Sequence, residues 1–292
     1  MRSTSLSLSL LGVLTLSLTT VSHAAPAISE KSAPAARIQA LTQANERAVK
    51  QFLVSLLDRS KEDEFFGVGP HRVVDLDGDG VPELLVALDD SGRAFYNTLR
   101  IVWADGAGFR VQDLGSWNLA SLAETVADLD GDGKMELILP QELTPYLGSR
   151  PMATWRAVYR LDKNRRYKAR SESFGTFYES RELPRIAKDI EQTRTNADRL
   201  SERRVSDRIL VLEIERDKLH RVLGDDPEAG LPSALEWATS SDPTRRLLAV
   251  GVLSDIRLPQ AQQALKVLAR DAHRDVGILA ERALAARTGD PR

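Results

Sequence analysis

Apolar positions recur in two different patterns along this chain. Over residues 35–60 they are spaced mostly three and four apart, which predicts one amphipathic helix whose apolar face must be covered. These positions are Ile38, Leu41, Val49, Phe52, Leu53, Leu56 and Leu57. Similar spacing over 185–223 predicts one or two helices, whereas the short apolar runs ELLVAL (83–88) and ELIL (136–139) predict strands. We therefore expect an α+β fold with two domains, a small antiparallel β domain (65–182) followed by an α-helical one (183–292).

Each predicted strand follows a loop in which carboxylates occupy alternate positions. The first loop, DLDGDGVPE (75–83), returns 53 residues later (128 − 75) as DLDGDGKME (128–136). Calcium binds six to eight oxygens, and this spacing directs alternate side chains at one centre. The expected ligands are Asp75, Asp77, Asp79, Glu83 and the Val81 carbonyl, and then Asp128, Asp130, Asp132, Glu136 and the Lys134 carbonyl. The simpler alternative is a pair of Asp-Gly hairpin turns.

The residues after the loops favour a strand over a helix. An EF-hand needs a bidentate acid at position 12, where these loops carry Val86 and Leu139. Pro82 also disfavours helical backbone at Val81. We therefore predict loops in which calcium stabilises a β-turn.

The whole unit of loop, strand and aromatic hairpin is duplicated over residues 65–170, and Phe66-Gly67 precedes the first loop. These features resemble the FG-GAP/VCBS repeats of integrin-type propellers and secreted bacterial proteins, and the resemblance implies that calcium holds each turn. Closed propellers have about four to eight blades. With two blade-like repeats, we expect two antiparallel sheets packed on each other, or a pair completed by another chain.

The C-terminal region contains a second duplication. LPSALEWATSSDPTRRLLAVGVLSDI (231–256) aligns with LPQAQQALKVLARDAHRDVGILAERAL (258–284). Each copy opens on Leu-Pro, which suits a first helical turn, and each has an Asp-led turn (Asp242, Asp271) followed by an arginine (Arg246, Arg274). The copies resemble HEAT-like repeats of the phycobilisome-lyase-like type, which implies a helical surface for a protein partner.

The N-terminus predicts export. Residues 1–24 resemble a signal peptide. They contain an apolar run from Leu6 to Leu18, and Ser22 and Ala24 fit positions −3 and −1 of a signal-peptidase cleavage site. The apolar run is too short to span a membrane readily, so we expect cleavage after Ala24 and no membrane span in the mature chain. Residues 25–34 are expected to form a linker. The predicted location is periplasmic or secreted. The chain has no cysteine, so no disulfide stabilises the fold.

The charge and the residue types of the chain exclude some classes of function. The net charge is −2, although residues 40–162 carry 12 basic and 20 acidic side chains; nucleic acid is not an expected partner. His71, His220 and His273 are scattered along the sequence without the spacing of metal ligands, and we predict no enzyme.

The leading hypothesis is an exported, non-catalytic calcium-binding protein that binds a protein partner through its helical domain. The alternative is a glycan-binding, lectin-like adhesin using Trp103, Phe109, Trp117 and Tyr146. A calcium-dependent enzyme would need an acid-lined pocket, for example at Glu124 or Asp162. The oligomeric state is left open.

Overall fold

The computed structural model describes residues 33–56, 67–89, 97–117, 119, 121–144, 153–197 and 201–288. The predicted signal peptide (1–24), all but the end of the predicted linker (25–34) and Tyr146 lie outside these residues. Within the described residues the chain has an α+β fold with two antiparallel sheets of four strands each.

Both sheets are built as consecutive antiparallel strands. The first contains β1 (Gly67–Val74), β2 (Glu83–Asp89), β3 (Asn97–Asp105) and β4 (Gly108–Trp117). The second contains β5 (Val126–Ala127), β6 (Glu136–Glu142), β7 (Thr154–Leu161) and β8 (Tyr167–Ala169). Each acidic loop joins the first two strands of its sheet, because Val74 pairs with Glu83 and Ala127 pairs with Glu136. The prediction that a strand follows each loop is confirmed.

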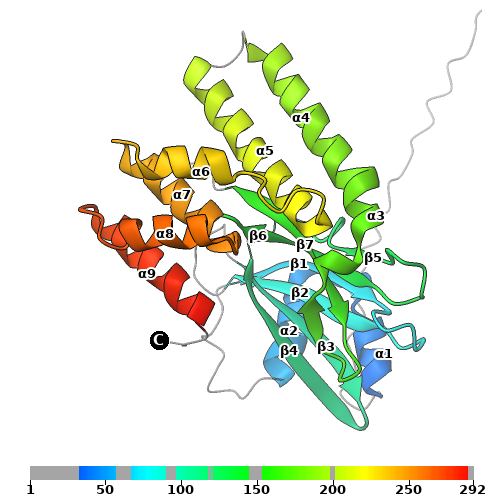
Figure 1. The fold of residues 1–292 in the computed structure, drawn as a ribbon. Coiled ribbons are helices and arrows are strands. Elements are labelled where there is room, and N and C mark those ends of the chain that lie inside the picture. The colour runs from blue at the N-terminus through cyan, green and yellow to red at the C-terminus, as the bar shows by residue number, and fades with distance from the viewer. Residues whose placement is uncertain are drawn as a thin grey trace, which may run out of the picture.

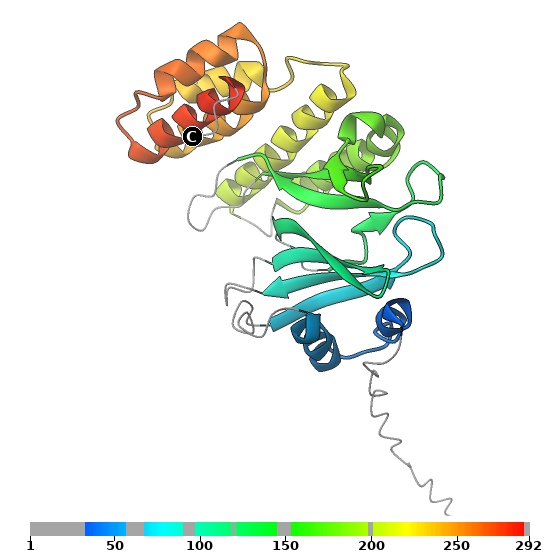
Figure 2. The same ribbon diagram turned by 90° about the horizontal axis from the view of Figure 1, so that it is seen from below.

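The two sheets pack face to face, and helices cover the outer face of each (Figure 2). Leu85 and Ala87 on β2 face the second sheet, where they meet Leu137 and Leu139. Their neighbours Leu84, Val86 and Leu88 face the N-terminal helices. Because side chains alternate along a strand, β2 is apolar on both faces, which explains its uninterrupted apolar sequence.

The N-terminal segment forms two helices where the spacing predicted one over 35–60. These are α1 (Pro34–Gln39) and α2 (Glu46–Leu56). The Asn45 side chain accepts a hydrogen bond from the Ala48 amide at 3.0 Å and caps the start of α2. The break lets Ile38 and Leu41 reach the sheet together with Phe52 and Leu53. Residues 57–60 lie outside the described part of the chain.

Helical structure begins before the predicted boundary at residue 183. Residues 171–182 form η2 (Ser171–Ser173), α3 (Gly175–Phe177) and the π-helical turn η3 (Tyr178–Glu182) instead of further strands. Phe174, Phe177 and Tyr178 pack there against Trp155 of β7. The first helical turns thus cover an apolar face of the second sheet.

Two long helices follow and lie side by side, projecting beyond the second sheet (Figure 1). They are α4 (Leu183–Thr195) and α5 (Glu202–Leu223). The chain then folds into two helical pairs, α6 (Leu231–Ala238) with α7 (Pro243–Asp255) and α8 (Pro259–Leu268) with α9 (Arg274–Thr288). No described helix is both long enough and apolar enough to span a membrane.

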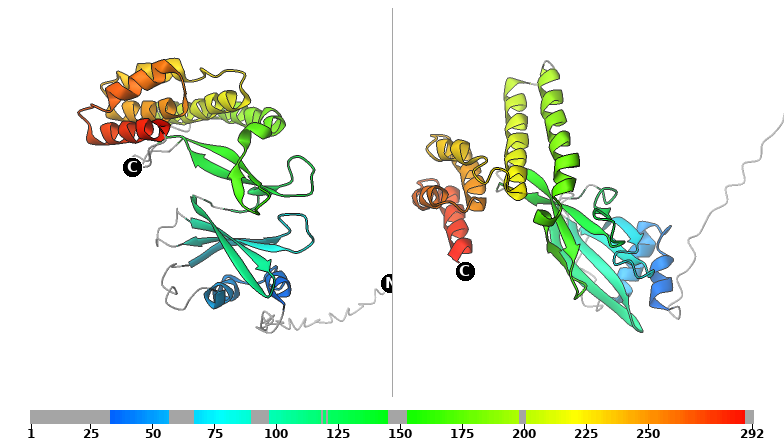
Figure 3. Two further views of the ribbon diagram at one scale, coloured as in Figure 1. Left: turned by 60° about the horizontal axis from the view of Figure 1, so that its bottom comes forward. Right: turned by 45° about the vertical axis from the view of Figure 1, so that its right-hand side comes forward.

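The helical pairs stack on each other beyond α5 (Figure 3). An ion pair spans the stack: Arg246 of α7 places Nε 2.7 Å and Nη2 3.0 Å from the two carboxylate oxygens of Asp271. The arginine that follows the first Asp-led turn therefore binds the aspartate of the second turn. This contact joins the two copies of the duplicated sequence.

Candidate metal centre

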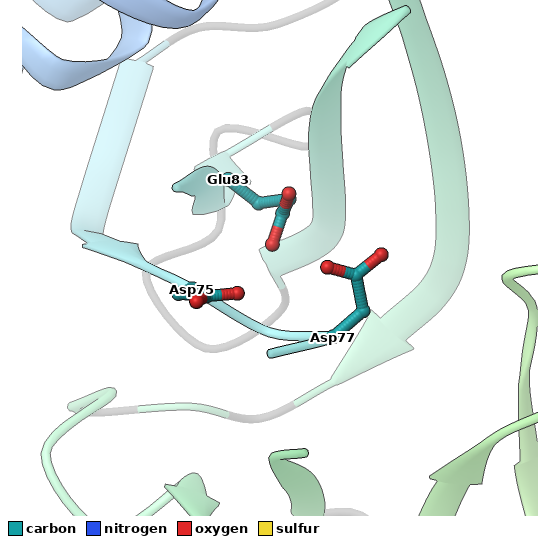
Figure 4. A group of neighbouring side chains, drawn as sticks. All are labelled: Asp75, Asp77 and Glu83. Carbon is teal, nitrogen blue, oxygen red and sulfur yellow. The ribbon is translucent and has the colours of Figure 1, made fainter. Parts of the chain in front are cut away.

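Each acidic loop brings three carboxylates together. In the first loop, one oxygen each of Asp75, Asp77 and Glu83 lies within 4.8 Å of the others. Figure 4 shows the three side chains around a common space, with the aspartates on the loop and Glu83 at the start of β2. Asp128, Asp130 and Glu136 form the same group in the second loop. Both groups could hold a metal ion.

Backbone amides bind the first aspartate of both loops in the same way. Asp75 accepts hydrogen bonds from Gly78 (2.8 Å) and Gly80 (2.9 Å), which have left-handed φ angles of 74° and 84°. Asp128 accepts the equivalent bonds from Gly131 (2.7 Å) and Gly133 (3.1 Å). Because glycine adopts this backbone at little cost, the glycines of the motif allow the chain to wrap around its first aspartate.

The two glutamates lie deepest in these groups. Glu83 is 1% exposed and Glu136 is fully buried. One oxygen of each accepts an amide at the start of its own loop, Leu76 at 2.7 Å and Leu129 at 2.9 Å. The second oxygen of Glu136 and one oxygen of Asp77 are buried and accept no hydrogen bond from the described residues. Buried, unpaired carboxylate oxygens are energetically costly, and a cation would satisfy them.

The electrostatics agree with this geometry. Burial, and then repulsion from Asp77, Asp79 and Asp75, raises the pKa of Glu83 to about 8. Burial also raises the pKa of Glu136, and Asp130 and Asp132 add to that effect. Each site therefore opposes its own full ionisation. A bound divalent ion would instead lower the pKa of these glutamates, because it favours their ionised form.

The third aspartate of each loop lies outside the three-carboxylate group. One oxygen of Asp79 accepts the Val81 amide at 2.8 Å, and Asp132 likewise accepts the Lys134 amide at 2.9 Å. The other oxygen of each binds an arginine. Nη2 of Arg165 lies 3.0 Å from Asp79, and Nη2 of Arg160 lies 2.7 Å from Asp132. The structure therefore gathers six of the eight predicted carboxylates, and Val81 and Lys134 use their amides to hold the remaining two.

Sequence reasoning missed these arginines. Arg160 is on β7 and Arg165 is in the turn before β8, so neither belongs to the loop motif. Arg165 is 88 residues from Asp77 and nevertheless binds it, with Nε 2.7 Å from Oδ2. Only the packing of the second sheet against the first brings them together, and the loop sequences carry no signal of it.

The two loops also contact each other. The Met135 amide donates to the Leu76 carbonyl at 3.0 Å, and the Tyr167 hydroxyl donates to the Met135 carbonyl at 2.8 Å. A Cβ atom on Gly78 would lie 2.7 Å from the Gly133 carbonyl oxygen. Gly78 is thus required both for its left-handed backbone and for the close approach of the loops. The two candidate sites are parts of one structural unit.

The described residues also form a cleft of about 530 Å³ between Leu119, residues 121–125, β6, β7 and the α4–α5 hairpin. Glu124 and Glu215 line it, as an enzyme site would require, but both are paired with arginines. Nη2 of Arg156 lies 3.1 Å from Glu124, and Arg185 binds Glu215. Asp162 does not line the cleft; it pairs with Lys168 at 3.0 Å in the β7–β8 turn.

Three of the four candidate glycan-stacking aromatics pack inside the β region. Trp103 is fully buried. Phe109 meets Phe52 edge to face with ring centroids 5.2 Å apart, and Trp117 meets Tyr159 at 5.6 Å. Phe109 and Trp117 are half-buried by these contacts, and no observation on the described residues favours the lectin alternative.

Comparison with known proteins bears on the β region. A family model for an FG-GAP-like repeat matches residues 75–139, from the first aspartate of the first loop into β6. The FG-GAP part of the predicted resemblance is confirmed: the chain contains an FG-GAP-like repeat. No curated protein and no solved structure matches the chain. The resemblance of the helical region to HEAT repeats stays a prediction.

Proposed function

We propose that this protein is an exported, non-catalytic calcium-binding protein. Calcium stabilises its β-repeat domain, and its helical domain binds a protein partner. The observation that carries the calcium assignment is the duplicated carboxylate group, held by the same hydrogen bonds in both loops. The same carboxylate geometry in both loops supports a shared ligand more strongly than one acidic cluster would alone.

The chemistry of the sites favours calcium among the common metal ions. All the donors are oxygens, and histidine and cysteine are absent from both groups. Hard cations prefer such donors, whereas zinc and copper prefer nitrogen and sulfur. Asp75, Asp77 and Glu83 would hold one ion, and Asp128, Asp130 and Glu136 the other. The Val81 and Lys134 carbonyls are the further donors proposed from the loop spacing.

The bound ion has a structural role in this proposal. Glu83 and Glu136 each begin the second strand of a sheet, while the aspartates come from the preceding loop. An ion shared by both elements would close the turn and neutralise its mutual repulsion. Export would place these loops where free calcium is abundant, in the periplasm or outside the cell.

The proposed partner site is on the stacked helices α6–α9. Repeated helical pairs present extended surfaces suited to protein binding. Val267 of α8 is 64% exposed and gives this surface an apolar side chain that a partner could cover. This surface is separate from the acidic loops, so the two proposed activities are independently testable.

The experiment that tests calcium binding is thermal unfolding in EDTA and in about 1 mM calcium. Extracellular calcium modules have dissociation constants of ~0.1–1 mM. At the tighter end, each site adds roughly 1.4 kcal/mol to the free energy of unfolding. Two sites would raise Tm by about 5–10 °C. Because Mg²⁺ retains its bound water more strongly than calcium does, magnesium at the same concentration should give a much smaller shift.

Asp77→Ala and Asp130→Ala should each remove about half of the calcium-induced shift. Glu281→Gln provides a control, since it removes one carboxylate from the exposed surface of α9, and should leave the shift unchanged. A calcium-induced shift below about 1 °C in the native chain would contradict the proposal.

A further inference from the structure

An arginine lies on the same two positions of each loop. Arg165 binds Asp77 and Asp79 in the first loop. Arg160 binds Asp130 at 2.9 Å and Asp132 at 2.7 Å in the second. These are the third and fifth loop residues in both cases. The two guanidinium groups reach these aspartates from different places, Arg160 from β7 and Arg165 from the β7–β8 turn. The duplicated sequence does not therefore supply both arginines from equivalent positions.

The arginines use groups that the metal would need. Asp77 and Asp130 belong to the carboxylate groups that could hold an ion. Nε of Arg160 also lies 4.0 Å from the Glu136 oxygen that accepts no hydrogen bond. A guanidinium at these distances repels a divalent cation at the same carboxylates and competes for their lone pairs. The ion and the arginine cannot both make their best contacts.

Arg165 is held in place by an unusual backbone and a stacked ring. Its φ is 55°, and no other non-glycine residue in the described part of the chain has a positive φ. Such a turn position normally favours glycine or asparagine. Its guanidinium lies 5.0 Å from the Trp103 ring centroid, a cation–π contact. The chain keeps an arginine at a backbone position that is costly for it, which points to a role for the side chain.

We infer that Arg165 and Arg160 are resident counter-cations that neutralise the loops without metal and that calcium must displace. The inference rests on the proposed function and adds to it the residues that set calcium affinity. With the arginines in place, the β domain keeps its loops closed at low calcium. Calcium then binds more weakly than the carboxylates alone would allow, and binds by exchange.

The exchange has a particular consequence at the first loop. Arg165 belongs to the β7–β8 turn of the second sheet, whereas Asp77 and Asp79 belong to the first. The Arg165 carbonyl also accepts a hydrogen bond from Arg110 of β4 at 3.4 Å. Calcium at the first loop therefore releases a side chain that joins the two sheets.

The test measures calcium binding by titration calorimetry on the full chain, together with Tm in EDTA. Arg165→Gln and Arg160→Gln remove each guanidinium. Each should tighten calcium binding at its own loop by about fivefold, the change that corresponds to ~1 kcal/mol for a partly exposed ion pair. The same variants should lower Tm in EDTA, because the loop carboxylates then lose their counter-charge.

Two controls separate this effect from general charge and from damage. Arg166→Gln makes the same charge change at the adjacent residue, which contacts neither loop among the described ion pairs, and should change affinity by less than about twofold. Arg165→Lys keeps the charge and should retain most of the competition. A merely structural role for the arginines predicts the opposite sign, with weaker calcium binding in the variants that lose stability.

The outcomes also distinguish the two proposals. If the native chain binds calcium and the Gln variants bind it equally or more weakly, the inference is wrong and the proposed function stands. If only the Gln variants bind calcium, the proposed function fails for the native chain, whereas competition between arginine and calcium is supported. If neither the native chain nor any variant binds calcium, both proposals fail.

Discussion

Glu215 shows how one buried residue can make the stability of the helical hairpin depend on pH. It is on α5, is 7% exposed, and binds Arg185 of α4. Arg185 also contacts Glu182 at 3.0 Å and Asp189 at 3.2 Å. One guanidinium is thus shared by three acids. Burial is the largest influence on Glu215, and it raises the pKa to about 7 although Arg185 opposes the shift.

A raised carboxyl pKa means that folding favours the protonated acid. The stability contributed by Glu215 is therefore fully present below its ordinary pKa of 4.5 and is lost as the pH rises through about 7. Glu215→Gln keeps a neutral side chain at every pH. Between pH 5 and pH 8, we expect the free energy of unfolding of this variant to rise by about 1–3 kcal/mol relative to the native chain. Urea unfolding in EDTA at several pH values measures it.

The matched control is Glu191→Gln, which neutralises an exposed acid on α4. Its free energy of unfolding should stay parallel to that of the native chain across this pH range. A constant difference between Glu215→Gln and the native chain from pH 5 to pH 8 would show that Glu215 is ionised throughout and that Arg185 fully compensates its burial.

At the scale of elements, helix α7 is seated directly on the end of the second sheet. Gly251 is buried on α7, where a Cβ atom would lie 2.5 Å from the Leu143 carbonyl oxygen and 2.9 Å from the Thr144 Cα. Both are backbone atoms just after β6, so a side-chain rotation cannot relieve the clash. A glycine that would normally weaken a helix here permits the helix to approach the β domain.

Gly251→Ala should therefore destabilise the protein by about 1–3 kcal/mol, since the added methyl group overpacks a junction of two backbones. Gly277 of α9 provides the comparison, because the nearest atoms to its Cβ position are 3.5 and 3.6 Å away. Gly277→Ala should stabilise the protein by about 0.5–1 kcal/mol through better helix propensity. Urea unfolding of both variants measures the difference, and effects of equal sign would contradict this account of the junction.

At the scale of the whole molecule, apolar clusters run in sequence through the layers visible in Figure 2. Helices α1 and α2 cover the first sheet, the second sheet follows, and α4 and α5 cover its other face. The stacked pairs α6–α9 lie beyond them. The acidic loops are contained in the β layers, so the proposed calcium sites do not involve the surface of the helical pairs.

Partner binding through this surface has its own test. The full chain should capture a protein from the exported fraction of its source cells. Val267→Asp should reduce that capture at least about tenfold, because a buried charge at an interface is costly. Val111→Asp is the control: Val111 is also exposed, at 39%, but lies on β4, and its capture should be unchanged. Equal capture by both variants would place the partner site away from α8.

Local sequence determined most of the elements. The strands after the acidic loops were predictable because Pro82 and the apolar runs act on neighbouring residues. The C-terminal helical pairs were predictable from their Leu-Pro starts and Asp-led turns. The single helix over 35–60 was not a correct prediction, because its apolar spacing is nearly continuous and only the cap at Asn45 and the fit to the first sheet mark the break.

In the candidate site too, some features follow from local sequence and others only from tertiary packing. By itself, the sequence determined the two acidic loops, since consecutive residues supply the carboxylates and the glycines that turn them toward one point. Only the tertiary structure decided that Arg165 would reach Asp77 across 88 residues and that the loops would touch at Gly78 and Gly133. Those contacts depend on the packing of one sheet against the other, and no local pattern encodes the distance between residues that meet only when two faces are buried together.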